Sequence, residues 1–268
     1  LLTPNCFSSS YFIKKMYPTL FEIAGLRIDS YSVVWFIALS LAIIWVVHRL
    51  EKYDIDEDTA RKIMSVSFLF MLLGARAPEI FENWREYFAK PSLFLDLNRG
   101  SLYETGAVLG AFISALFLTF LNRKKVSFLK LCEAASIPAM FSIVVGRWGC
   151  FLNGCCIGTE TEYFFGVHFP FDKADLMRHP VQIYYSIFAL VSVLILLSVE
   201  KFISKRRSLS NSHSILAPLS LIFYSLMRLS IDYLRFVPSE WIYKFLAYAL
   251  IFEFLWLAYG IKKLIRNA

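Results

Sequence analysis

The sequence predicts an all-α polytopic membrane protein with about seven transmembrane helices. Of its 268 residues, 57% are hydrophobic and 26 are Phe, and the mean hydropathy is +0.55. This content is too apolar for the surface of a soluble domain, so lipid is the expected solvent. The second observation is the length of the apolar runs, because a helix needs about 20 mostly apolar residues to cross a bilayer.

Seven such runs follow one another along the chain. They are too long, and their connections are too short, for the roughly 10-residue alternating strands of an outer-membrane barrel, so each run is expected to be a helix. The runs cover residues 31–48, 62–81, 102–121, 128–151, 181–199, 215–234 and 241–261.

The Lys and Arg residues predict the orientation. The net charge is +7, but the basic residues bracket the runs and form no stripe interleaved with aromatic residues, so no nucleic-acid partner is expected. One alternate set of loops carries fifteen of them and the other set carries ten. The positive-inside rule therefore predicts a cytoplasmic C-terminus and an N-terminus outside.

A single transmembrane domain is expected over residues 16–268. Residues 1–15 are expected to be a disordered or untranslated extension, because Leu1 is not an initiator and Met16 stands just before the first patterned segment. The extension has little apolar content and no small-residue cleavage site, which does not fit a removable signal peptide.

Three arginines lie inside the apolar runs: Arg76, Arg147 and Arg228. An Arg at the bilayer centre costs about 3 kcal/mol on insertion scales, so each of them needs a partner, a wet cavity or a function. With the predicted orientation, all three fall in the outer halves of outward-running helices. The sequence therefore predicts that they converge on an outward-facing site.

Polar residues open the inward-running helices on the same face. Tyr31 stands at the start of the first run, Glu104 at the start of the third, and His179 and Gln182 at the start of the fifth. These side chains are expected to face the arginines, because intramembrane polar groups turn towards a bundle interior.

The sixth run carries a charged face of its own. Arg228, Asp232 and Arg235 have the spacing i, i+4, i+7, which places them on one side of a helix. Asp232 can neutralise only one arginine, so this face keeps positive charge. Each residue also has a structural explanation, since an Arg–Asp pair can be a helix clip and an Arg near a span's end can snorkel to the interface. The coincidence of several such residues favours a site.

The most specific segment is residues 146–158, which hold four glycines and begin Gly146-Arg147. We expect these glycines to break the helix and expose backbone N–H groups beside Arg147. Exposed amides next to a guanidinium suit an anion, above all a phosphate. The alternative is an ordinary helix C-terminus that ends in a Gly turn.

The cysteines of this segment leave several readings open. Cys150, Cys155 and Cys156 are expected near the outer face, where disulfides form. A disulfide from Cys150 to either neighbour, a nucleophilic thiol activated by Arg147, and small residues filling tight space are the alternatives. The spacing lacks the paired CxxC pattern of structural zinc, so no metal is expected.

Three motifs together resemble the prolipoprotein diacylglyceryl transferase family. They are the Gly-Arg-x-Gly-x-Phe-x-Asn-Gly core at 146–154, the His-Pro-x-Gln-x-Tyr motif at 179–184 and the Arg-x-x-x-Asp-x-x-Arg motif at 228–235. Tyr31 and Gly74-Ala75-Arg76 stand where that family has similar signatures. The resemblance runs over nearly the whole chain from Met16.

The resemblance implies a seven-helix enzyme of the bacterial cytoplasmic (inner) membrane with its active site towards the outer face. Such an enzyme moves the diacylglyceryl group of phosphatidylglycerol onto the thiol of a lipobox cysteine in a prolipoprotein signal peptide and releases glycerol 1-phosphate. Membrane lipid and signal peptide would both arrive laterally in the bilayer. No cofactor is implied.

Roles for individual residues follow from the resemblance and from the charge pattern. Arg147 is assigned to the phosphate, with assistance from Arg228 and Arg235, because a phosphate leaving group needs a cation beside it. Asn153 and Tyr31 would orient glycerol oxygens, and a nearby base would accept the thiol proton. The expected catalytic residues are Arg147, Glu104, Arg228 and Asp232; the expected substrate-binding residues are Arg147, Asn153, Gly154, Tyr31, Arg76, Arg235, His179 and Gln182.

The chain departs from the family pattern at several polar positions. Glu104 stands where the family usually has a His, and Cys150 and Cys155 replace Asn and Glu of the core motif. Tyr185 replaces a Glu, and Asp232 is an Asp rather than a Glu. Glu104 could serve as the base in place of the His, because an apolar site raises the pKa of a carboxyl towards neutrality.

Three other functions remain as alternatives. A divergent paralogue would act on another lipid or acceptor. An extracytoplasmic thiol-redox membrane protein would use Cys150, Cys155 and Cys156. A lipid or anion transporter would call for discontinuous helices or repeated halves, which the sequence does not display.

Overall fold

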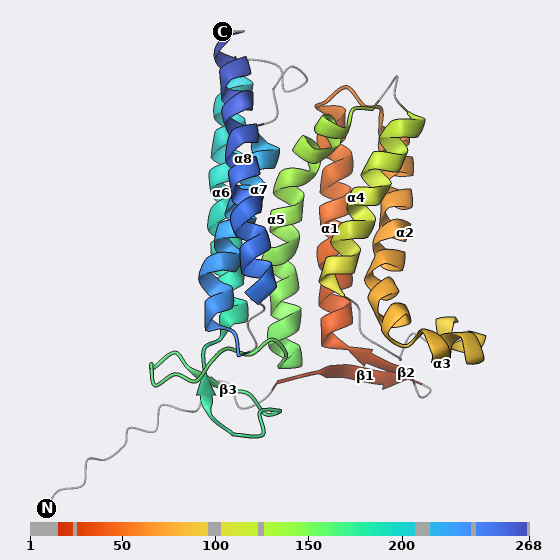
Figure 1. Cartoon of the computed structure of the whole chain (residues 1–268), viewed down its shortest axis with the longest axis vertical. Helices are drawn as coiled ribbons and strands as arrows, with labels where there is room; N and C mark the ends of the chain where they lie inside the picture. The colour runs from red at the N-terminus through yellow and green to blue at the C-terminus, as the bar shows by residue number, and fades with distance from the viewer. Residues whose placement is uncertain are drawn as a thin grey trace, which may run out of the picture.

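Helices account for most of the chain in the computed structural model, which describes residues 16–23, 26–95, 103–122, 126–206, 215–236 and 240–266. Each predicted apolar run coincides with a helix (Figure 1). The helices are α1 (Ser30–Glu51), α2 (Glu57–Glu82), α4 (Glu104–Leu121), α5 (Phe128–Asn153), α6 (Val181–Arg206), α7 (Leu216–Ile231) and α8 (Glu240–Arg266).

Four of these helices are long and apolar enough to cross a bilayer, among the residues that the structure describes. They are α1, α2, α5 and the Val181–Ser204 part of α6, and the apolar part of α4, Gly106–Leu121, is shorter. The chain is therefore a mostly helical, polytopic membrane protein, as the sequence predicted. Residues 1–15, including the expected extension, lie outside the described part.

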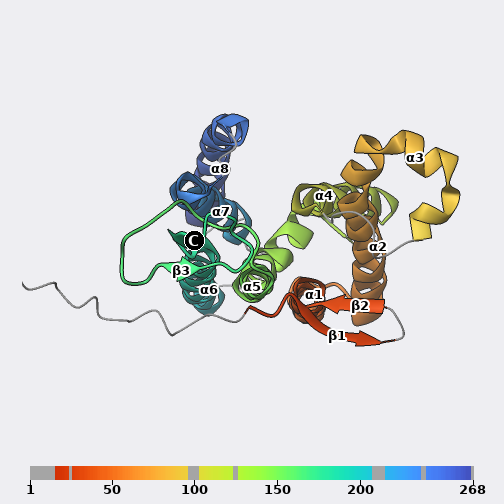
Figure 2. The same ribbon diagram turned by 90° about the horizontal axis from the view of Figure 1, so that it is seen from below.

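The helices form two groups with α5 between them. Seen from below, α1, α2 and α4 lie on one side and α6, α7 and α8 on the other (Figure 2). α5 packs against α1, α6 and α7, whereas α2 packs chiefly against α4. The position of α5 explains why its residues meet side chains from both groups.

Glycines let α2 and α4 approach closely. A Cβ added to Gly74 would lie 2.3 Å from the carbonyl oxygen of Gly106, and one added to Gly110 would lie 2.1 Å from that of Phe70. Small residues at such crossings are typical of membrane helices, since they allow backbone contact without a hydrophobic driving force. The pair forms a tight unit within its group.

All strands lie at one end of the bundle, which we call the strand end (Figure 1). An antiparallel hairpin of β1 (Thr19–Ile23) and β2 (Leu26–Asp29) leads directly into α1. A second pair, β3 (Val167–His168) and β4 (Met177–Arg178), lies between α5 and α6. The sequence analysis did not predict these strands, because two to five residues carry too little periodic signal. Two short helices, α3 (Trp84–Ala89) and η1 (Pro91–Leu95), follow α2 at the same end.

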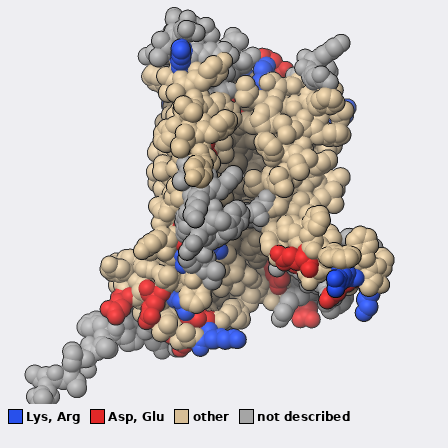
Figure 3. Space-filling model, in the orientation of Figure 1, with Lys and Arg blue, Asp and Glu red and all other residues tan. Residues whose placement is uncertain are grey.

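The outer surface has the charge distribution of a membrane protein. Figure 3 shows Lys, Arg, Asp and Glu gathered near the two ends, with a broad band of other residues between them. Large apolar side chains stand exposed on this band, among them Phe36, Leu73 and Phe120, each 62% exposed. Such a belt would be unfavourable in water and is suited to lipid.

Candidate active site

Arg147 is buried in the strand-end half of α5. Its guanidinium carbon lies 4.3 Å from the centroid of the Tyr185 ring of α6. Stacking on an aromatic face stabilises a desolvated guanidinium, since the ring's negative quadrupole faces the cation. The Tyr185 ring therefore supports the buried charge of Arg147.

The charged face predicted for the sixth run forms at the end of α7. Arg228 Nη2 lies 2.9 Å from Asp232 Oδ2, and Arg235 Nη1 lies 4.0 Å from Asp232 Oδ1. Arg228 and Asp232 are both buried, whereas the Arg235 side chain is 26% exposed. One carboxylate thus serves two arginines, as expected from the spacing.

Cys156 connects these arginines to Arg147. Hydrogen bonding with the Cys150 and Cys155 thiols lowers the pKa of the Cys156 thiol, and the positive charges of Arg235 and Arg147 lower this pKa further. Cys156 therefore lies within electrostatic reach of Arg147 in α5 and of Arg235, which follows α7 and the short 3-10 helix η3 (Asp232–Leu234). We call the set Arg147, Arg228, Asp232 and Arg235 the arginine cluster; it holds three guanidinium groups and one carboxylate.

The glycines of the core motif do not break the helix, so that expectation was wrong. α5 runs without interruption through Gly146 and Gly149 to Asn153. A Cβ at Gly146 would lie 2.7 Å from the Trp35 ring, and one at Gly149 would lie 3.0 Å from Val34 Cβ. These glycines exist for close packing against α1, which periodicity within one segment cannot reveal.

Gly154 ends α5 in a glycine turn, which was the alternative that the sequence left open. It has φ of 68°, a left-handed conformation, and the N–H of Cys155 donates to the Cys150 carbonyl at 3.1 Å. This is a Schellman cap, which satisfies the last carbonyls of α5. A helix C-terminus carries partial negative charge, so the positive potential of the site comes from the arginine side chains rather than from backbone amides.

The cap places Asn153 and Gly154 at the strand end, beside Met16. A Cβ added to Gly154 would lie 3.1 Å from Met16 Sδ and from Phe171 Cδ2. Asn153 is partly buried, and the Cys155 thiol, two residues later, donates to the Cys150 carbonyl at 3.6 Å. Both residues thus lie next to the three cysteines.

Gln182 and His179 hold the segment that follows the cap. Gln182 is 1% exposed and its Nε2 donates to the Cys155 carbonyl at 2.6 Å, while Nδ1 of His179 lies 3.1 Å from the Tyr184 hydroxyl. The N–H of Gly158 donates to the His179 carbonyl at 3.2 Å. Through these bonds the residues after α5 are fixed to the start of α6.

A buried ion pair closes the loop that contains β3 and β4. Arg178 Nε lies 2.6 Å from Asp172 Oδ2, and the guanidinium carbon of Arg178 lies 4.5 Å from the Phe236 ring centroid. The hydrogen bond from Arg178 lowers the pKa of Asp172 below its ordinary value. The loop therefore has a fixed connection to the chain after α7.

Tyr31, Arg76 and Glu104 are placed less centrally. Tyr31 is the second residue of α1, and its carbonyl oxygen would lie 3.3 Å from a Cβ at Gly149, so it borders α5. Arg76 is partly buried in the strand-end half of α2, whose chief partner is α4. Glu104 is the first residue of α4, and its side chain lies outside the described part of the structure. The predicted arginines therefore share one end of the bundle, but Arg76 lies in the other helix group from the arginine cluster (Figure 2).

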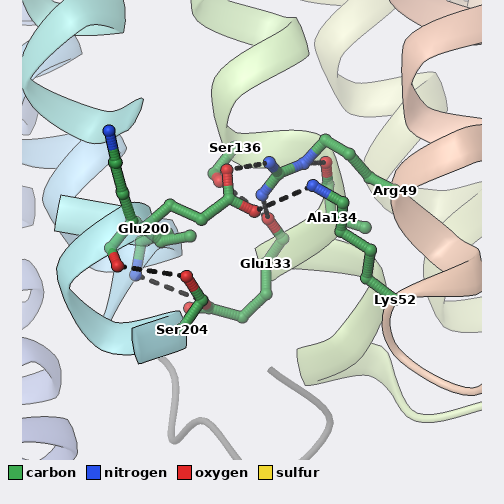
Figure 4. A network of polar contacts seen from close by, with 9 residues as sticks. Arg49, Lys52, Glu133, Ala134, Ser136, Glu200 and Ser204 are labelled. Carbon is green, nitrogen blue, oxygen red and sulfur yellow. Dashed lines mark hydrogen bonds and ion pairs between the residues drawn. The ribbon is translucent and has the colours of Figure 1, made fainter. Parts of the chain in front are cut away.

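A second buried polar network lies at the opposite end, and the sequence analysis missed it (Figure 4). Arg49 of α1 donates to Glu200 Oε2 at 2.7 Å, to the Ala134 carbonyl at 2.8 Å and to the Glu133 carbonyl at 3.2 Å. Lys52 lies 3.7 Å from Glu200 Oε1. Glu133 was detectable as a lone acid inside an apolar run, and Glu200 as an acid directly after one.

The carboxylate of Glu133 caps α7. It accepts hydrogen bonds from the N–H groups of Leu216 at 3.2 Å and Ala217 at 2.9 Å. A carboxylate is stabilised there by the partial positive charge of a helix N-terminus. A further missed acid, Glu253 of α8, accepts from Ser225 of α7 at 3.1 Å.

Known proteins share the sequence over most of its length. A family model described as prolipoprotein diacylglyceryl transferase matches residues 18–265. The phosphatidylglycerol-prolipoprotein diacylglyceryl transferase of Clostridium novyi (strain NT) is 33% identical over 226 residues, which are 82% of this chain and 84% of the relative. The protein of the same name from Clostridium tetani (strain Massachusetts / E88) is 29% identical over 83% of this chain and 87% of the relative. That from Rickettsia akari (strain Hartford) is 28% identical over 81% of this chain and 83% of the relative.

Proposed function

Because the chain belongs to the prolipoprotein diacylglyceryl transferase family, we propose that it transfers a diacylglyceryl group from phosphatidylglycerol to the thiol of a lipobox cysteine. The carbon–oxygen bond between the glyceryl carbon and the phosphate breaks, and a carbon–sulfur bond forms. Glycerol 1-phosphate leaves with the bonding electrons. The thiol proton passes to a base or to solvent.

The observation that carries this proposal is the surplus of positive charge in the arginine cluster. Arg228 and Arg235 share the carboxylate of Asp232, and Arg147 stacks on Tyr185 at the same end of the bundle. A departing phosphate gains negative charge in the transition state, and guanidinium groups fixed in a desolvated site stabilise that charge more than water does.

We assign the closest phosphate contact to Arg147. Arg147 is buried in the Gly-rich core motif and stacks on the Tyr185 ring, whereas Arg228 is paired with Asp232. Arg228 and Arg235 assist, and Asn153 and Tyr31 orient glycerol oxygens at the border of α5 and α1. Gln182 acts by positioning, because its Nε2 already holds the turn after α5.

The remaining assignments complete the proposal. Glu104 is the carboxyl base, Arg76 and His179 contact substrate, and Gly154 gives the turn beside them its shape. All seven long helices cross the bacterial cytoplasmic membrane with the strand end outside, in agreement with the distribution of Lys and Arg. Lipid and signal peptide enter sideways from the bilayer, which suits the exposed apolar belt.

The test is product formation in a reconstituted system. The full chain is placed in vesicles that contain phosphatidylglycerol and a lipobox peptide, and mass spectrometry looks for the diacylglyceryl thioether. We expect product with this peptide and none with its Cys→Ser counterpart or with phosphatidylethanolamine as the only phospholipid. Absence of product under conditions where a known family member forms it would overturn the proposal.

A divergent paralogue is the second candidate, favoured by the thiols at Cys150 and Cys155. Product that forms from a different phospholipid or a different acceptor in the same vesicles would support it.

A further inference from the structure

Three thiols converge beside the arginine cluster. The sulfur atoms of Cys150, Cys155 and Cys156 all lie within 4.8 Å of one another, and none of them forms a disulfide. Cys150 is 3% exposed, and the other two cysteines are partly buried. Within the described part of the chain, this is the group that brings three metal-ligating side chains together.

The helix cap produces this convergence. In a Schellman cap the second residue after the helix folds back over the last turn, and here that residue is Cys155 and the last turn presents Cys150. Cys156 has φ of 58°, a left-handed conformation that a non-glycine residue rarely adopts. Backbone strain of this kind persists where the surrounding structure holds a functional arrangement in place.

The spacing fits a thiophilic cation. Sulfur atoms bound at about 2.3 Å to one Zn²⁺ lie roughly 4 Å apart, so the observed cluster needs only small side-chain shifts. Three thiolates and one divalent cation together carry one negative charge. Arg147 and Arg235 lie close enough to offset it, and the negative end of α5 favours a cation.

We propose that Cys150, Cys155 and Cys156 bind one thiophilic d¹⁰ cation, represented by Zn²⁺, and leave its fourth position open to the acceptor thiol. Three protein ligands with one open position is the arrangement of catalytic rather than structural zinc. Binding of the cation releases the three thiol protons to solvent.

The second half of this inference rests on the proposed function. The acceptor thiol replaces water on the cation and loses its proton, through the proposed base Glu104, to solvent, because a coordinating thiol is deprotonated. The resulting sulfur is the nucleophile that forms the carbon–sulfur bond.

Metal analysis of the full chain tests the site. The protein is purified in detergent with its thiols reduced, equilibrated with Zn²⁺ or Co²⁺, and freed of excess metal. We expect one Zn²⁺ per chain and a thiolate-to-Co²⁺ charge-transfer band. Cys156→Ser should weaken binding at least ten-fold, while Cys132→Ser, which changes a partly buried cysteine earlier in α5, should leave binding unchanged.

Three results would overturn the site. They are no bound metal in the reduced wild-type protein, binding that survives unchanged in Cys156→Ser, and a disulfide between two of the three cysteines in the protein as isolated. Binding of Cu⁺ in preference to Zn²⁺ would support the thiol site and identify its ion.

The open position is tested without turnover. Addition of the lipobox peptide to the Co²⁺-loaded protein should increase the charge-transfer band, and the Cys→Ser peptide should not. An unchanged band overturns the acceptor role. Since both readouts are independent of product, failure of the transferase assay with metal still bound would count against the proposed function alone.

Discussion

The two buried charge networks of this bundle differ in their balance. At one end, Arg49 and Lys52 face Glu200, and each hydrogen-bonding nitrogen of the Arg49 guanidinium has an acceptor. Glu133 joins the same region and caps α7. At the strand end, Arg228 and Arg235 share Asp232, and Arg147 stacks on an aromatic ring.

Under the proposed function, this difference separates charge that holds helices together from charge that binds substrate. The balanced network connects α1, α5, α6 and α7 and has little capacity to receive a further ion (Figure 4). A buried network with surplus charge is costly unless a ligand of opposite sign completes it. The two ends should therefore respond in opposite ways to the loss of one arginine.

The largest expected effect is on catalysis. Arg147→Ala should lower thioether formation about 10²- to 10³-fold, the loss typical of removing one charge-stabilising donor from an active site. Its thermal unfolding in detergent should change little. Arg147→Lys should recover part of the rate, and Arg61→Ala, which removes an exposed partner of Glu57, serves as the control. Full activity in Arg147→Ala would contradict the phosphate role of this residue.

At the other end, Arg49→Ala should destabilise the protein by about 3–5 kcal/mol, because it leaves the Glu200 carboxylate buried with too few partners. The expected reading is a lower unfolding temperature, with the rate per folded molecule within a few-fold of wild type. The double change Arg49→Met with Glu200→Leu should recover stability, since it removes both charges. If the double variant were as unstable as the single one, packing rather than charge would be the cause.

A smaller effect is expected where α5 meets α1. Gly146→Ala places a Cβ 2.7 Å from the Trp35 ring and should cost about 1–3 kcal/mol through overpacking. Trp35→Leu in the same chain should relieve the clash, as measured by thermal unfolding. No change in Gly146→Ala would mean that the two helices separate easily, and Arg147 would then be less firmly placed than we infer.

The smallest effect concerns Asp172 and Arg178, an ion pair of opposite charges that lies at the strand end, where the arginine cluster carries surplus positive charge. The pKa of Asp172 is lower in the folded protein, so the pair stabilises the loop above the ordinary Asp pKa of about 3.9. That contribution is lost as the pH falls through the lowered value. Limited proteolysis should cleave the 159–178 loop of the wild-type protein faster in acid than at neutral pH, and Asp172→Asn should remove this pH dependence. If the cleavage rate rose equally in acid for the wild type and for Asp172→Asn, groups other than Asp172 would be responsible for the acid effect.

Much of the architecture followed from local properties of the sequence. An apolar run of about 20 residues has few alternatives to a helix in lipid, so every predicted run coincides with one. The spacing of Arg228, Asp232 and Arg235 likewise predicted that the three lie together, and they do, although α7 ends at Ile231 and the last two residues belong to the 3-10 turn that follows. The family resemblance followed from the same short motifs.

Contacts between distant segments were decided only by the tertiary structure. Gly146 is a packing residue because Trp35, more than a hundred residues earlier, lies against it. The sulfur atoms of Cys150, Cys155 and Cys156 converge because a left-handed cap turns the chain back on α5. The partners of Arg147 and Glu133 depend on which helices pack against α5, and a single sequence does not predict which helices become neighbours in the fold. The sequence thus determined which charged residues lie within the apolar helices, and helix packing determined whether each of them meets a residue of opposite charge.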